Sequence, residues 1–365
     1  MADITKDAAY NAVAPDDFKS MIEVDRYNAR TPHFDKIITA THTHFWDPLD
    51  KKYIDYDTPF DMNTPMLPLD FVAEMATPIG QRMSDAEKVA FVNENFRWML
   101  SAILHGEQGA LSLSASLCHV LKDPGAQEYA SNQAREEARH VLGFSRYIQT
   151  RWGEPLPCGN TLANLLEEMV NAPEVYKKLV GMQMLVEGLA MGAFASIFEF
   201  TNDPLARHLT QLVMTDEAFH HKFGKIWADK TMPHVSEEER HIIEDWAAEC
   251  FQTLLFNLGA PFEKRVVYEK FGIDWEEATA EIAKVITVEK RREVMGRQSS
   301  IFRVLIKTLL NAGIITDRTK ALYATYVDMD ELKNEGDEMV GDAIAADGIK
   351  FLERVNLRGQ AEAAE

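Results

Sequence analysis

Two matching groups of glutamate and histidine constrain this chain more than any other feature of its sequence. Each group is a single glutamate followed 30 residues later by a Glu-x-x-His motif: Glu107, Glu137 and His140 in the first, Glu187, Glu217 and His220 in the second. Residues three apart on a helix share a face, so the Glu and His of each motif can reach one metal ion. Four carboxylates and two imidazoles on facing helices are a ligand set that holds two iron or manganese ions inside a four-helix bundle.

Helix signals surround all six residues. Ser84-Asp85-Ala86-Glu87 has the capping-box pattern, which predicts a helix from there to about Leu121. The other ligand-bearing helices are expected at 127–151, 174–200 and 204–231, and further helices at 161–171, 236–258, 262–271, 275–311, 317–327 and 333–354, the 275–311 helix with an interruption near 285–287. No stretch alternates as a strand does, so the expected fold class is all-α.

The helical pattern predicts three regions. Residues 1–83 are rich in proline, aspartate and aromatic residues, which predicts an irregular segment packed on the bundle. Residues 84–231 form the metal-binding bundle, and 232–365 add helices to the same domain.

The surroundings of the single glutamates favour metal ligands over solvated acids. One Glu-x-x-His alone is typical of a solvated helix face, but Glu107 and Glu187 lie on apolar helices, where a charge is costly unless paired or bound to metal. We expect Glu107 and His140 on one ion and Glu187 and His220 on the other. Glu137 and Glu217 would bridge them.

An acid precedes each paired glutamate. Glu136 and Asp216 can accept the free N–H of the ligand histidines across the bundle, which would fix the orientation of the rings. The alternative is a pair of surface acids. Arg139 either pairs with these acids inside the bundle or is solvated, and His221 points away from the ligand face.

Apolar neighbours of the single glutamates are expected to line a substrate pocket. These neighbours are Leu104, Ala110, Leu111, Met184, Met191, Phe194 and Phe198. For each of them, simple core packing is the alternative.

Charge and cysteine content limit the partners and the compartment. A net charge of −20 and a pI near 5.0 argue against nucleic acid and anionic membranes. No stretch approaches 18 uninterrupted apolar residues, so no membrane span is expected. Three cysteines without CxxC spacing, and an N-terminus (Met1–Ile4) without a secretory pattern, indicate a reducing cytoplasm.

The motifs resemble those of the ferritin-like diiron-carboxylate oxidoreductases over about residues 85–230. That superfamily includes multicomponent monooxygenase hydroxylase subunits, acyl carrier protein desaturases and ribonucleotide reductase small subunits. The resemblance implies a ferritin-like four-helix bundle, a homodimer and activation of O2 by two iron ions, with manganese possible at one position. Three positions depart from the pattern: Phe144 replaces a radical tyrosine, Ala190 and Met191 stand where a threonine is found, and Val213 replaces the extra histidine of N-oxygenases.

The function expected from the residues and the resemblance is a diiron monooxygenase that oxidises a hydrophobic or aromatic substrate. The chain has neither a GxGxxG motif before a helix nor a cysteine cluster, so electrons would come from an external ferredoxin or flavoprotein reductase. The alternatives are a desaturase acting on an acyl group carried by acyl carrier protein or coenzyme A, a radical-generating or ligand-binding oxidase with a manganese–iron pair, and a non-catalytic iron-binding protein.

Overall fold

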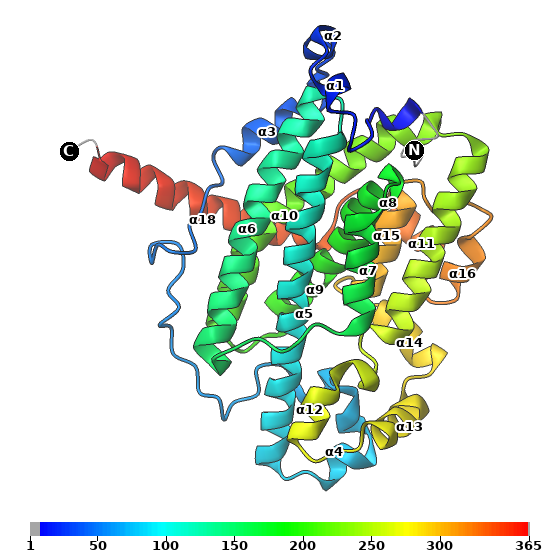
Figure 1. The fold of residues 1–365 in the computed structure, drawn as a ribbon. Helices are drawn as coiled ribbons and strands as arrows, with labels where there is room; N and C mark the ends of the chain where they lie inside the picture. The colour runs from blue at the N-terminus through cyan, green and yellow to red at the C-terminus, as the bar shows by residue number, and fades with distance from the viewer. Residues whose placement is uncertain (1–7, 364–365) are drawn as a thin grey trace.

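The computed structural model describes the backbone of residues 8–363 and the side chains of residues 8–357. Within this range the chain is helical, and its one extended pairing is an isolated bridge between Ala12 and Leu121 (Figure 1). The all-α prediction is therefore confirmed. The segment Met1–Ile4, whose composition argued against a secretory signal, lies outside the described residues.

Four helical segments carry the two glutamate–histidine groups. They are α5 (Asp85–Val120), α6 (Pro124–Trp152), a third formed by α8 (Val175–Val180), a π-helical turn η5 (Gly181–Val186) and α9 (Glu187–Phe200), and α10 (Pro204–Thr231). In Figure 1, α5 and α6 run side by side, and α10 packs against both α9 and α6. The four segments thus enclose a common interior.

Local signals fix where these helices begin. Ser84 accepts from the N–H of Glu87 and Glu87 accepts from the N–H of Ser84, which completes the expected capping box. α6 begins at Pro124, three residues earlier than expected, because the Asp123 side chain caps it and proline is tolerated in the first turn.

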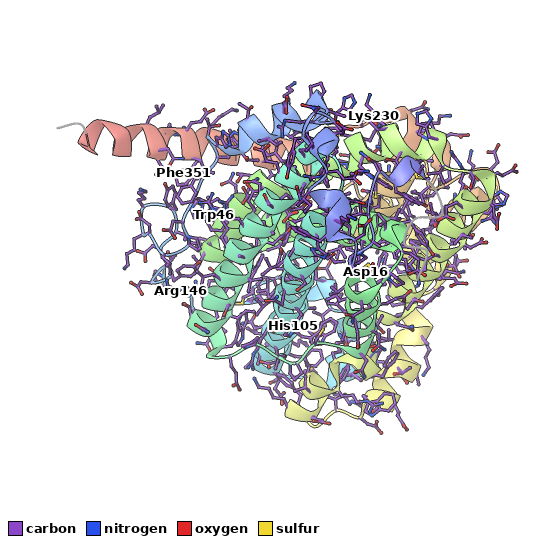
Figure 2. All side chains as sticks on the ribbon, turned by 45° about the horizontal axis from the view of Figure 1, so that its top comes forward. Asp16, Trp46, His105, Arg146, Lys230 and Phe351 are labelled. Carbon is purple, nitrogen blue, oxygen red and sulfur yellow. The ribbon has the colours of Figure 1, made fainter. Side chains whose placement is uncertain are left out.

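The remaining helices cover the four segments. α7 packs on α5, α15 on α9 and α18 on α10, while the C-terminal part of α18 projects from the body in Figures 1 and 2. Their bounds are α7 (Asn160–Asn171), η6 (Met232–His234), α11 (Glu237–Asn257), η7 (Pro261–Lys264), α12 (Arg265–Lys270), α13 (Trp275–Val285), α14 (Val288–Met295), α15 (Ile301–Asn311), α16 (Lys320–Ala324), α17 (Met329–Asn334) and α18 (Val340–Ala363).

Two expected C-terminal helices are divided in the structure. The 275–311 segment forms α13, α14 and α15: the side chain of Thr287 caps a new helix at the interruption that was expected, and a second break follows α14 at Gly296. The 333–354 segment is interrupted after α17 by Gly336, whose φ of 68° ends the helix. Two short helices of this C-terminal region contact α11: α14 through Arg291 and Leu255, and α16 through Tyr323 and Phe251.

The N-terminal region contains short helices between its turns. The longest is α3, and the set is η1 (Ala8–Tyr10), α1 (Phe18–Met21), α2 (Val24–Tyr27), η2 (Pro32–Phe34), α3 (Asp35–Thr41), η3 (Leu69–Phe71), η4 (Ala73–Ala76) and α4 (Pro78–Arg82). Its aromatic side chains Tyr10, Trp46 and Tyr53 are buried, so this region packs on the helices. Figure 2 shows side chains, Trp46 among them, filling the spaces between the ribbons.

One helical segment in the described range, Val175–Phe200, is long and apolar enough to cross a membrane by length and composition alone. However, 78% of its most apolar window is buried inside the protein. It also carries the buried Glu187. Burial of this kind is typical of a core helix, which passes the same test.

Gly192 allows α9 and α15 to approach closely. A Cβ at this position would lie 2.5 Å from the Cα of Ile301, a backbone atom that cannot turn aside. We expect Gly192→Ala to lower the free energy of unfolding by about 1–3 kcal/mol, measured by chemical denaturation. Gly106→Ala is the matched control, because a Cβ there meets nothing within 4 Å. It should raise stability by about 0.5–1 kcal/mol, and equal effects of the two substitutions would contradict this packing account.

Candidate metal centre

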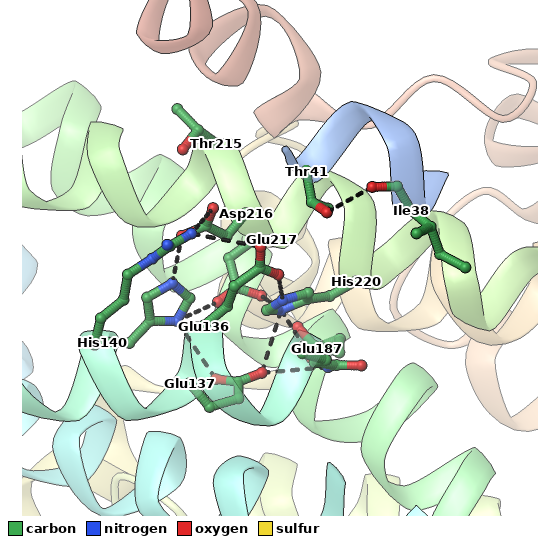
Figure 3. Close-up of polar contacts among 12 residues, drawn as sticks. Ile38, Thr41, Glu136, Glu137, His140, Glu187, Thr215, Asp216, Glu217 and His220 are labelled. Carbon is green, nitrogen blue, oxygen red and sulfur yellow. Dashed lines mark hydrogen bonds and ion pairs between the residues drawn. The ribbon is translucent and has the colours of Figure 1, made fainter. Parts of the chain in front are cut away.

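The six residues singled out by their spacing meet in the interior between the four segments. Figure 3 labels all of them except Glu107. Each is at most 5% exposed: Glu107, Glu137, His140, Glu187, Glu217 and His220. The equal spacing in the two groups places both Glu-x-x-His motifs at the same depth, one on α6 and one on α10. Buried carboxylates in this number require compensating positive charge.

The side chains form two groups with the spacing of metal ligands. Within each group, the candidate ligand atoms lie within 4.8 Å of one another. The first group is Glu107, Glu137, His140 and Glu217, and the second is Glu137, Glu187 and His220. In addition, Oε2 of Glu217 lies 3.2 Å from Nδ1 of His220. These buried residues can therefore hold a metal ion.

Glu137 and Glu217 each present one oxygen to each histidine. In Glu137, Oε2 lies 3.4 Å from Nδ1 of His140, and Oε1 lies 3.2 Å from Nδ1 of His220. In Glu217, Oε1 lies 3.2 Å from Nδ1 of His140. The single glutamates are more local, with Glu107 3.3 Å from His140 and Glu187 3.6 Å from His220. Glu137 and Glu217 thus contact both histidines, whereas Glu107 contacts His140 and Glu187 contacts His220.

The outer nitrogen of each histidine faces an acid from the opposite helix. Nε2 of His140 lies 2.9 Å from Asp216, and Nε2 of His220 lies 2.9 Å from Glu136 (Figure 3). Each acid thus contacts the histidine of the other motif across the bundle, as the sequence predicted. An N–H donated from Nε2 leaves the lone pair of Nδ1 directed at the carboxylates.

Arg139 joins the two acids, which decides between the two placements left open by the sequence. Its side chain is 10% exposed and lies 2.5 Å from Asp216 and 3.5 Å from Glu136. Trp46 also donates its indole N–H to Asp216 at 2.9 Å and stacks against His140. Asp216 therefore accepts from an arginine, a tryptophan and a histidine, which fixes its position.

A pair of glutamines supports the other side of the cluster. Gln133 donates to Glu187 at 2.8 Å and to Glu137 at 3.2 Å, and its own carbonyl accepts from Gln183 at 2.9 Å. Gln183 lies in the π-helical turn directly before Glu187. Such turns are frequent at functional sites, where they change the direction of the side chains that follow.

The pKa values of the clustered side chains are set by two opposing effects, burial and the charges of their neighbours. Burial raises the pKa of Glu107 and Glu187 well above the ordinary range of a glutamate. Burial acts in the same direction on Glu217, but the charge of His220 outweighs it and lowers the pKa to about 2. Burial lowers the pKa of His140 and His220, yet the surrounding carboxylates outweigh it and raise both pKa values well above normal. The carboxylates therefore favour positive charge on the two imidazoles.

The contacts among these residues leave polar atoms unsatisfied, and a bound metal ion would satisfy them. Oε2 of Glu137 is buried and has no hydrogen-bond partner. In addition, the Nδ1 atoms of both histidines face several carboxylate oxygens each at 3.2–3.6 Å, from the long end of the usual hydrogen-bond range upward. Carboxylate oxygen and neutral imidazole are ligands suited to iron and manganese. A cation among these atoms would satisfy the unpaired oxygen and release the protons from the imidazoles.

An apolar cavity of about 260 Å³ opens onto the carboxylates of Glu107, Glu137, Glu187 and Glu217. Its other walls are apolar side chains from α5, α7, α9 and α15. A dry cavity of roughly 150 Å³ already holds benzene in another protein, so this volume accepts a small apolar molecule. We call it the inner cavity.

Two of the seven residues expected to line a pocket, Ala110 and Phe194, line the inner cavity. The other five do not: Leu104, Leu111, Met184, Met191 and Phe198. The expectation failed for them because the residues at helical spacing from Glu107 and Glu187 cover a face wider than the cavity, which lies to one side of it. On α9 the cavity faces Leu189, Ala190 and Ala193, whereas Met191 lies toward Gly341 of α18.

The chain matches no protein-family model and no curated protein sequence. What the site can do must therefore follow from its own residues.

Sequence reasoning did not identify Trp46 or Gln133 as parts of the site. Gln133 carries a signal, since it lies one turn before Glu137 on the same helix face. Trp46 carries none, because it is 170 residues from the aspartate it contacts and follows an irregular segment.

Proposed function

We propose that this chain is a diiron oxygenase of ferritin-like fold that activates O2 to oxidise a hydrophobic or aromatic compound. One observation carries the proposal: two buried ligand groups share Glu137, and their carboxylates open onto an apolar cavity. The motif order along the chain, with its resemblance to the diiron-carboxylate oxidoreductases, supports the same reading. Electrons would come from an external ferredoxin or flavoprotein reductase. Cytoplasmic location and homodimerisation belong to the proposal as well.

Glu107 and His140 would hold one iron, Glu187 and His220 the other, and Glu137 and Glu217 would hold both. The metal pair, when bound, supplies reversible redox chemistry and Lewis acidity toward O2. Manganese at one position uses the same ligands.

The chain's own residues prepare the site for this chemistry. Asp216 and Glu136 hold the Nε2 protons of the histidines, so Nδ1 stays available as a ligand. Gln133 orients Glu187 through a donated hydrogen bond. The apolar walls of the inner cavity exclude water and leave room for a substrate beside the carboxylates.

Repeated oxygen consumption tests the proposed activity. Iron-loaded protein, reduced chemically under anaerobic conditions and then exposed to O2, should consume O2 again after each reduction. A mixture of small apolar compounds should yield oxygenated products detected by mass spectrometry with labelled O2. Uptake limited in each cycle to the stoichiometric oxidation of the ferrous iron, with no labelled product, would identify a non-catalytic iron-binding protein and reject the proposal. Desaturated products without labelled oxygen would reject the monooxygenase in favour of a desaturase.

Asp216→Asn tests the support of His140. We expect it to weaken iron binding about 10–100-fold, measured by competition with a chelator, because the imidazole loses a charged hydrogen-bond partner. Asp229→Asn is the control on the same helix, since Asp229 is exposed and pairs with Lys225. Equal affinities of the two variants would contradict the role given to Asp216.

A further inference from the structure

A second hollow, larger than the inner cavity, lies beside it. This outer groove has a volume of about 770 Å³. Four residues line both spaces: Trp98, Met99, Gly259 and Phe302. The two spaces therefore adjoin each other at these residues.

The rim of the outer groove exposes large apolar side chains. Phe256 is 50% exposed and Val288 49%, and Phe71 and Phe262 are exposed as well. Exposed apolar surface around a concave space favours binding of an apolar solute. The groove thus offers an apolar path from solvent toward the carboxylates of the metal centre.

One charged side chain that lines the outer groove has no partner of opposite charge among the described residues. Its charged lining residues are Glu74, Lys264 and Arg291. Lys264 and Glu74 neutralise each other at 2.8 Å. Arg291 has no carboxylate partner among the described residues; it donates one N–H to the carbonyl of Leu255 at 3.0 Å and lies over the ring of Phe256.

The guanidinium of Arg291 is suited to hold an anion. It has five N–H donors, and a single one is used in the contact with Leu255. Arg291 is half-buried, so its charge is partly removed from water without an acid to compensate it. A planar guanidinium matches a carboxylate through two parallel hydrogen bonds.

We propose that the outer groove binds a long-chain carboxylic acid, with its carboxylate at Arg291 and its chain passing Trp98, Gly259 and Phe302 into the inner cavity. The acid is then the hydrophobic substrate of the metal centre, a role that rests on the proposed function. The head-group contact does not, because no metal ligand lines the outer groove.

Binding to the metal-free, full-length chain tests the head-group contact. Calorimetric titration with straight-chain carboxylates, and with the alcohols of equal length, should give about tenfold or greater preference for the acids, as one charge-assisted pair provides. Arg291→Gln should remove this preference while alcohol binding persists, which also shows that the variant is folded. Arg265→Gln should keep it, because Arg265 lies 4.1 Å over Trp275 and does not line the groove. Equal binding of acids and alcohols by the unmodified chain, or an unchanged preference in Arg291→Gln, would overturn the proposal.

Gly259→Leu tests the passage. A Cβ at Gly259 meets nothing within 4 Å and its φ lies outside the left-handed region, so a side chain fits there without strain and enters the shared opening. We expect octadecanoate to bind about tenfold more weakly and octanoate to be affected less, because the longer chain must pass the opening. Unchanged octadecanoate binding would exclude the passage. In the unmodified chain, absence of acid binding with intact iron loading would reject this channel alone. Failed iron loading with intact acid binding would reject the metal centre alone.

Discussion

Replacing Glu137 by alanine is expected to abolish tight binding of two metal ions per chain. Glu137 belongs to both ligand groups, and its two oxygens face different histidines, Oε2 toward His140 and Oε1 toward His220. One substitution therefore removes a ligand from each ion at once. The metal content of the anaerobically loaded protein, measured by elemental analysis, should fall from two ions per chain to less than one.

Two comparisons make this result specific. His220→Ala should also prevent binding of the pair, because His220 is the one imidazole in the second group. Glu128→Ala, on the same helix as Glu137 but exposed and paired with Arg30, should leave the metal content unchanged. Two tightly bound ions in both Glu137→Ala and His220→Ala would show that the metals bind elsewhere.

Replacing Arg139 by leucine is expected to destabilise the metal-free protein by about 3–5 kcal/mol, because it leaves buried acids without their cation. Arg139 is the one cation from lysine or arginine within salt-bridge distance of Asp216 and Glu136 among the described residues. Burial alone would raise the pKa of Asp216, but the charge of Arg139, with the contact from His140, lowers it to about 2. Chemical denaturation at neutral pH measures the loss.

Arg135→Leu is the matched control for Arg139→Leu. Both arginines lie on α6 and over the ring of Phe45, at 5.3 Å for Arg135 and 5.9 Å for Arg139, but Arg135 is exposed. Its replacement should change stability by about 0.5 kcal/mol or less. If the two substitutions cost the same, Arg139 contributes through its contact with Phe45 and not through the buried acids.

The sequence predicts the site well because helical geometry is local. Once Glu137 and His140 lie on a helix, their spacing of three places them on one face, and the equal separation in the second group repeats this for Glu217 and His220. Helix starts with a strong side-chain cap, such as Ser84, are local too. These features need no knowledge of the tertiary fold.

Features that depend on distant contacts could not be predicted. The hydrogen bond from Trp46 to Asp216 joins residues 170 positions apart. The position of the inner cavity depends on where α7 and α15 leave space beside α5 and α9, which no periodicity encodes. For the same reason Met191, a plausible pocket residue by helical spacing, packs toward α18.

The most direct test of the metal centre is the iron content and Mössbauer spectrum of the full-length chain after anaerobic loading with ferrous iron and brief exposure to O2. Two ions held through Glu137 and Glu217 are expected to give two irons per chain and the spectrum of a magnetically coupled ferric pair. Iron that binds at less than one ion per chain, or that gives the spectrum of isolated ferric ions, would contradict a shared diiron site.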